Sequence, residues 1–287
     1  GGNGTYDFDQ STDVPSGKKF HNSLKLTVKS ASTNTGSYGY ALEHRIEGYN
    51  MRQLRLGRST AQPITVSFYV KSSVAGTYST GLRTTGGETS HVTEFTLSAN
   101  TWKYVTYTAP AQTASLSSLD EGTGLGLIVD VVGLGKQTSK ATSTLNAWQS
   151  GNYVFSNNQV AWMDNANATL FVTGLQVEMG NTATEFEHRS FGEELSLCKR
   201  YFFKAKFAHS AYGTTSVYPE SQYYFPTEMR ANPTISITGG TASNVASQSV
   251  RYNVTGGFAH NMGPSSNGMM YIGGGGNACD ITFTAEL

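Results

Sequence analysis

Acidic residues are the first side chains of this 287-residue sequence that could do acid–base chemistry. A glycoside hydrolase needs two carboxyl groups roughly 5–10 Å apart. Such pairs arise by chance in any β-rich chain of this size. We expect one of them, Glu43 and Glu47, to lie on a solvated strand or turn face with Arg45 and Arg52. The acidic pairs that are close in sequence are Asp7/Asp9, Glu43/Glu47, Asp120/Glu121 and Glu193/Glu194.

The sequence lacks the histidine, serine and glycine motifs that mark zinc enzymes, serine hydrolases and nucleotide-binding proteins. The six histidines stand singly, and the sequence has neither zinc-ligand spacing nor a Gly-x-Ser-x-Gly nucleophile motif. The stretch 133–138 is similar to the end of a phosphate-binding loop. Asp130, however, occupies the place of the leading glycine, and Gln137 replaces the hydroxyl that would bind Mg²⁺. We therefore expect neither enzymatic activity nor nucleotide binding.

Aromatic residues in polar surroundings are the more suggestive group, because a ring with an apolar face can stack on a sugar. Neighbouring amide, carboxylate and hydroxyl groups would then bind the sugar hydroxyls. For each ring the alternative is a partly buried position in or near the core. The candidate glycan contacts are Trp148, Tyr153, Trp162, Tyr212 and His260.

Few residues suggest a cofactor. Asp7 and Asp9 could join Glu178 in a structural calcium site, and no other metal or cofactor is expected. Cys198 and Cys279 are far apart in sequence and could form at most one disulfide, so we expect two buried, reduced thiols.

Composition narrows the class of partner. The formal net charge is +0 and only 14% of residues are charged, which argues against nucleic-acid binding because that requires a basic excess. No segment approaches the roughly 20 apolar residues of a membrane helix, so no membrane insertion is expected. The chain starts at Gly1 without a visible secretory signal, which indicates a fragment or a processed start.

Between Lys18 and Met179 apolar and polar residues alternate, which predicts strands with one buried face. The alternation slips by one residue around Gly174, as a β-bulge would require. Turn-forming clusters separate the strands, and no helical pattern lies between them. An antiparallel jelly-roll sandwich is therefore predicted for this part of the chain.

One short helix and a second β region are predicted after the sandwich. Ser190 and Glu193 form a capping box, and an apolar face follows at Leu195, Cys198 and Phe202. Strand-like, turn-rich sequence then continues to the C-terminus. The predicted fold is all-β, with a jelly-roll domain at 1–186, a helical connector at 187–204 and a small C-terminal β domain at 205–287.

Several segments together resemble the jelly-roll domain of bacteriophage tail-fibre and related virion appendage proteins of the marine phage type, which is often described as carbohydrate-binding. The resemblance is most specific at 183–201, where the capping box and the helix lie, and it is loose beyond Phe203. The other matching segments are 9–17, 43–50, 66–72, 76–78, 95–102, 144–151, 173–178 and 283–287.

The resemblance implies a non-enzymatic virion protein, assembled in the host cytoplasm, that recognises a host-surface polysaccharide or lipopolysaccharide. It also implies a homotrimer, with the C-terminal domain as the distal tip and other virion proteins as partners. Trimers suit this role because three weak sites gain avidity. Two alternatives remain open: a purely structural capsid decoration or tail adaptor protein, and a glycan-active enzyme or its accessory binding module.

Overall fold

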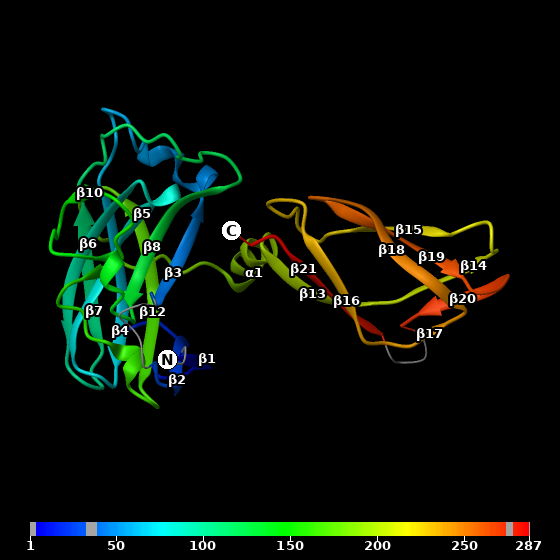
Figure 1. Cartoon of the computed structure of the whole chain (residues 1–287), viewed down its shortest axis with the longest axis horizontal. Helices are drawn as coiled ribbons and strands as arrows, with labels where there is room; N and C mark the ends of the chain where they lie inside the picture. Colours follow the sequence, from blue (N-terminus) through cyan, green and yellow to red (C-terminus); the bar gives the residue numbers. More distant parts are fainter. Residues whose placement is uncertain (1–3, 33–38, 274–277, 287) are drawn as a thin grey trace. The chain divides into compact units, whose positions relative to one another are not determined.

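The computed structural model describes residues 4–32, 39–273 and 278–286. Its contacts divide the chain into two compact units, which we call unit 1 (Gly1–Glu187) and unit 2 (His188–Glu286). Strands dominate both units, and Figure 1 shows them from blue to green in unit 1 and from yellow-green to red in unit 2. The predicted all-β class is confirmed. Among the residues described, no helix is long and apolar enough to cross a membrane.

Unit 1 is a sandwich of two five-stranded antiparallel sheets, as predicted. In order, sheet A contains β1 (Thr5–Ser11), β2 (Ser23–Ser30), β12 (Thr169–Met179), β4 (Ile64–Ser72) and β7 (Lys103–Ala109). Sheet B contains β10 (Trp148–Ser150), β6 (Thr89–Leu97), β5 (Gly76–Thr84), β8 (Leu125–Gly133) and β3 (Ala41–Glu47). Shorter elements are β9 (Ala141–Thr142), β11 (Phe155–Ser156), and the 3₁₀ turns η1 (Gly48–Leu54), η2 (Thr85–Gly87), η3 (Thr138–Lys140) and η4 (Trp162–Asp164).

The core of unit 1 lies between the two sheets and follows the period-two pattern of the sequence. The strand β4 illustrates this pattern, because its side chains Ile64, Val66, Phe68 and Val70 are all fully buried. Successive side chains of a strand point to opposite faces, so these four share the inner face. Burial of such a row stabilises the sandwich by roughly 1.5–3 kcal/mol for each large side chain.

The predicted bulge at Gly174 is confirmed. The register of β12 against β4 shifts between Thr173 and Gln176. Gly174 has a φ of 63°, and a Cβ there would lie 2.5 Å from Cζ of Phe20. Glycine is therefore required both by the backbone conformation and by the ring above it.

A segment after β10 covers the outer face of sheet B. The Gln159 side chain accepts from the Ser79 amide on β5 at 2.5 Å and donates to the Gly133 carbonyl on β8 at 2.7 Å. The Ser156 amide donates to Oγ of Ser79 at 2.7 Å. Because Phe155 and Gln159 are buried here, this part of the sheet face is filled by the chain itself.

Unit 2 contains three three-stranded antiparallel sheets around a second core. The first has the order β13 (Phe202–Phe207), β21 (Cys279–Thr284), β16 (Thr234–Thr238), and the second β14 (His209–Gly213), β20 (Gly268–Ile272), β17 (Ala242–Ser243). The third has the order β15 (Glu220–Tyr224), β19 (Gly257–Pro264), β18 (Val245–Val254).

The helix α1 (Phe191–Lys199) begins where the sequence predicts, because Oγ of the N-cap Ser190 accepts from the Glu193 amide at 3.3 Å. The predicted apolar face is shorter than expected, because Leu195 and Cys198 lie on α1 but Phe202 belongs to β13, and no helix residue is buried. The thiol prediction is half correct. Both cysteines are free, but Cys198 is exposed on α1, whereas Cys279 is buried on β21.

Candidate functional site

Two of the predicted glycan contacts are buried. Trp162 begins η4 with its side chain in the core of unit 1 and is 0% exposed. His260 lies on the central strand β19 of unit 2 and is likewise 0% exposed. Polar neighbours in the sequence suggested a surface position for Trp162, but tertiary packing buries both rings. Neither side chain can contact a sugar in this structure.

The other three predicted contacts lie in different places. Trp148 is half-buried on β10, where Nε1 donates to the Pro110 carbonyl at 2.6 Å and the ring packs edge-on against His91. Tyr153 is half-buried in the segment that covers sheet B. Tyr212 is 65% exposed on β14 of unit 2. Of the predicted rings, Trp148, Tyr153 and Tyr212 are therefore at least partly exposed.

The carboxylates of the suggested calcium site are also apart. Asp7 pairs with Thr27, and Thr27 pairs with Thr169 on β12. Glu178 lies nine residues further along β12, which is about 30 Å of strand. Asp7 forms an ion pair with Lys29. No cluster of three metal-ligating His, Cys, Asp or Glu side chains occurs among the described residues.

A charged cluster on the outer face of sheet B includes Glu43, which is exposed and pairs with the exposed Arg45, as expected. The expectation is wrong for Glu47, which is buried. Arg83 is 5% exposed and donates to Asp130 through Nε at 2.7 Å and Nη2 at 2.6 Å. Its Nη2 also pairs with Glu43, and Glu47 is buried. Burial raises the pKa of Asp130 to about 6, while the Arg83 hydrogen bonds limit the rise. The cluster joins three strands, and the Arg83–Asp130 pair at its centre is buried while the Glu43 side chain is 27% exposed, so the cluster serves stability.

An open hollow beside Tyr104, which we call the Tyr104 hollow, lies at the edge of the sandwich. Its walls come from β5 and β6 of sheet B and from β7 of sheet A, and its volume is about 480 Å³. This lies within the roughly 300–1,000 Å³ of small-molecule sites. The lining residues are Thr77, Thr93, Glu94, Phe95, Thr96, Lys103, Tyr104, Val105, Thr106 and Tyr107.

The Tyr104 hollow combines an aromatic rim with polar groups. The Tyr104 ring is 42% exposed and lies on the outer face of sheet A, where it contacts Tyr69 with ring centroids 4.8 Å apart. Lys103 Nζ donates to the Thr96 carbonyl at 3.0 Å, and Glu94 Oε1 accepts from Asn158 at 3.0 Å. Sequence analysis missed this site. The only signal for it is that Tyr104 and Thr106 occupy the outward positions of an alternating strand.

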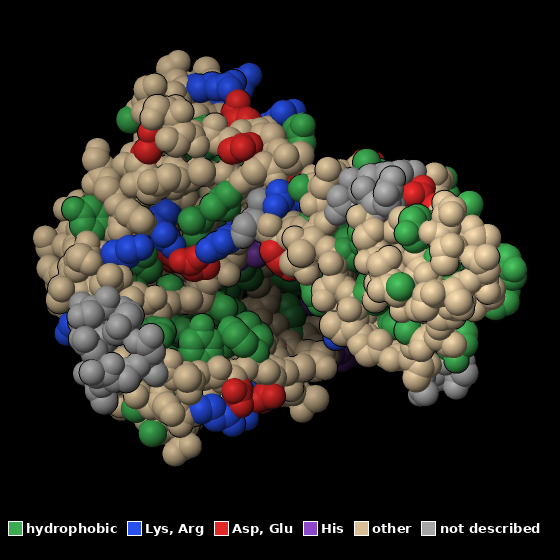
Figure 2. All heavy atoms as spheres, turned by 45° about the vertical axis from the view of Figure 1, so that its right-hand side comes forward, with side chains coloured by type: hydrophobic (Ala, Val, Ile, Leu, Met, Phe, Trp, Pro, Cys, Tyr) green, Lys and Arg blue, Asp and Glu red, His purple; other side chains and the backbone are tan. Residues whose placement is uncertain are grey.

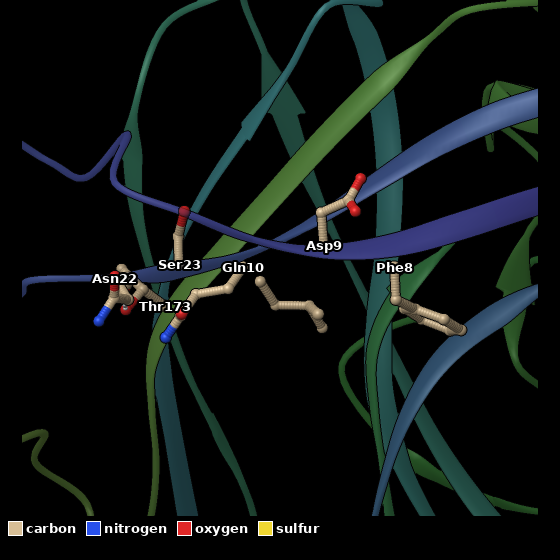
Figure 3. A pocket seen from close by; sticks show the side chains of 7 residues that line it. Phe8, Asp9, Gln10, Asn22, Ser23 and Thr173 are labelled. Atoms are coloured by element: carbon tan, nitrogen blue, oxygen red, sulfur yellow. Dashed lines mark hydrogen bonds between the residues drawn. The ribbon is translucent and has the colours of Figure 1, made fainter.

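A second shallow hollow, which we call the Phe8 groove, crosses the edge of sheet A. Phe8 and Gln10 pair with Leu26 and Leu24, so they extend the inner face of the sheet beyond the core. Figure 3 shows Phe8, Gln10, Asn22 and Thr173 on one side of the strands and Asp9 on the other. The Phe8 ring is 58% exposed, so this groove has an apolar end and an amide-rich end.

Most of the surface seen in Figure 2 is neither hydrophobic nor charged, in agreement with the 14% charged residues. Unit 2 nevertheless exposes large apolar side chains on one sheet face. Tyr212 on β14 lies opposite Met269 on β20, and Tyr271 follows two residues later on the same face. Their side chains are 65%, 64% and 39% exposed. We call these three residues the Tyr212 face.

No protein-family model and no curated protein matches the chain. Among solved structures, a family 4 carbohydrate-binding module is 15% identical, with a TM-score of 0.33 over 60% of this chain and 89% of the module. The family 22 xylan-binding domain from Paenibacillus barcinonensis is 10% identical, with a TM-score of 0.29 over 63% and 86%. An arabinose-bound α-L-arabinofuranosidase is 9% identical, with a TM-score of 0.32 over 61% and 22%. With TM-scores below 0.5, none of these similarities assigns a ligand or an activity to this chain.

Proposed function

We propose that unit 1 binds a glycan in the Tyr104 hollow. The observation that carries this proposal is the exposed Tyr104 ring at the rim of a hollow that is lined by four threonines, one carboxylate and one ammonium group. The apolar face of a sugar ring stacks on Tyr104, and the sugar hydroxyls exchange hydrogen bonds with the threonines and Glu94. Because the one carboxylate and the one ammonium group balance in charge, the hollow suits a neutral sugar better than a phosphorylated one.

The lining of this hollow favours binding of a glycan without its hydrolysis. Glycoside hydrolysis needs a pair of carboxyl groups, and Glu94 is the only carboxylate among the lining residues. The same side chain already accepts a hydrogen bond from Asn158. A carboxylate held in this way positions a sugar hydroxyl and has no partner to complete an acid–base pair.

The proposed context is a phage tail fibre or receptor-binding appendage, and it rests on the sequence resemblance. In that context the Tyr212 face supports a homotrimer, since its three exposed apolar side chains are the kind of surface that a second copy would cover. Light scattering of the full chain is then expected to return three times 30.8 kDa. The monomer mass would count against the fibre role.

Glycan-array screening followed by calorimetry tests the binding proposal. Tyr104→Ala is expected to weaken the best glycan about tenfold, equivalent to about 1.4 kcal/mol, through loss of ring stacking. Tyr49→Ala is the matched control, because Tyr49 is 49% exposed on η1 and contacts Arg52, outside the hollow. An unchanged affinity in Tyr104→Ala would refute this site.

The same experiment separates binding from a purely structural role. A trimer that binds no glycan, and that does not compete with adsorption of the phage to its host, would instead support the capsid decoration or tail adaptor alternative. Hydrolysis of a bound glycan would support the enzyme alternative, and Glu94→Gln should then abolish it.

A further inference from the structure

Four polar side chains of unit 2 form a continuous hydrogen-bonded row. Ser221 Oγ lies 2.8 Å from His209 Nε2, and His209 Nδ1 lies 3.0 Å from His260 Nδ1. His260 Nε2 in turn lies 3.3 Å from Oε1 of Gln248. The residues come from four different strands, β15, β14, β19 and β18. Four strands therefore hold the row in place.

The row has a single direction of proton donation. The amide oxygen of Gln248 can only accept, so Nε2 of His260 carries the proton of that ring. A neutral imidazole has one N–H, so Nδ1 of His260 accepts from Nδ1–H of His209. This leaves Nε2 of His209 without a proton, and it accepts the hydroxyl proton of Ser221. Every donor points from the serine toward the amide.

Burial keeps both imidazoles neutral. His209 is 5% exposed and His260 is 0% exposed. The His260 ring packs edge-on against Phe207 at 5.0 Å, and the His209 ring contacts Tyr223 at 6.3 Å. Burial lowers the pKa of His209, and burial together with His209 lowers the pKa of His260 to about 4. At neutral pH the serine therefore faces an unprotonated nitrogen.

We propose that Ser221 is a nucleophile activated by His209 and that it accepts an acyl group from a carboxylic ester. A serine, a base within hydrogen-bond reach and a third group that orients the base are the recurring parts of such sites. His260 is then the positioning residue. Ser221 is only half-buried and lies on β15, one of the two edge strands of its sheet, which is the side from which the proposed substrate would approach.

The proposed step balances in atoms and charge. Oγ of Ser221 bonds to the ester carbonyl carbon while its proton passes to Nε2 of His209. The ester C–O bond breaks, and the departing alkoxide takes that proton and leaves as an alcohol. Water then attacks the acyl-serine with His209 as base again, releasing the carboxylic acid and restoring the serine. This activity is independent of glycan binding in unit 1.

A fluorophosphonate tests the nucleophile directly, because it bonds to an activated Oγ with loss of fluoride. Peptide mapping of the full chain by mass spectrometry is expected to find the label on Ser221. His209→Gln should slow labelling roughly 100-fold through loss of the base. Ser210→Ala is the matched control, since Ser210 neighbours His209 on β14 but points outward, and it should label like the wild type. With p-nitrophenyl acetate, a burst equal to the amount of chain should appear.

The pH profile of labelling tests whether His260 positions His209 or only stabilises unit 2. His260→Ala lets water reach His209 and should move the acid midpoint of labelling upward, whereas a structural loss would lower only the melting temperature. Absence of label from Ser221 in the wild-type chain, or equal labelling of many serines, would overturn the proposal. Mapping the wild type decides this even if a variant fails to fold.

Discussion

Arg83 and Asp130 face each other across β5 and β8 through two hydrogen bonds, although they are 47 residues apart in the sequence. Both side chains are at most 6% exposed. Breaking a buried pair leaves an uncompensated charge, so Asp130→Asn should lower the free energy of unfolding of unit 1 by about 3–5 kcal/mol. Asp7→Asn, which breaks the exposed pair with Lys29, should cost less than about 1 kcal/mol.

Tryptophan fluorescence in urea measures this difference selectively. Trp102, Trp148 and Trp162 all lie in unit 1, so their signal follows unfolding of that unit within the full chain. Equal midpoints for Asp130→Asn and Asp7→Asn would show that the buried cluster does not stabilise the sandwich.

Gly174→Ala should destabilise unit 1 by about 3 kcal/mol. The new Cβ would clash with Phe20, and alanine would also be strained at a φ of 63°. Gly17→Ala isolates the strain, because Gly17 has a φ of 72° and nothing within 4 Å of a built Cβ. It should cost only about 1 kcal/mol. The same fluorescence assay compares the two, and a Gly17→Ala cost as large as that of Gly174→Ala would exclude the clash.

Ser190→Ala should cost about 1 kcal/mol of helix stability, since the Glu193 amide loses its partner. Hydrogen exchange of the α1 amides measures the loss. The assay is sensitive to the cap because no side chain of α1 is buried against the rest of the unit. Ser196→Ala, in the middle of the helix, is the control and should leave exchange unchanged or slower. Faster exchange in Ser196→Ala alone would mean that the cap is not the stabilising contact.

Unit 2 should lose stability as the pH falls from about 6.5 to 4. The pKa of His260 is 6.5 when unperturbed and about 4 in the folded chain, so the unfolded chain binds more protons in this window. Its contribution is fully present above pH 6.5 and declines as the pH falls, by up to roughly 3 kcal/mol. Calorimetry over this pH range measures it, and His260→Gln should flatten the dependence. An equally steep curve in His260→Gln would assign the effect to other groups.

The sandwich and the helix start were predictable because the sequence signals for them lie within a few neighbouring residues. Alternation along β4 and β8, the glycine at position 174 and the serine at position 190 each carry a signal within a few residues. The partners of Arg83 were not predictable, since Asp130 and Glu43 reach it only when three strands align. In the same way, Trp162 has polar sequence neighbours, but its side chain is 0% exposed in the folded chain. The Tyr104 hollow exists only where strands of two sheets meet, so no window of sequence contains it.

The three small sheets of unit 2 have consequences for handling the protein. A three-stranded sheet has two edge strands, and each edge presents backbone donors and acceptors that another chain can pair with. A concentrated preparation of isolated chains is therefore exposed to strand-by-strand association, whereas copies assembled side by side would shield these edges.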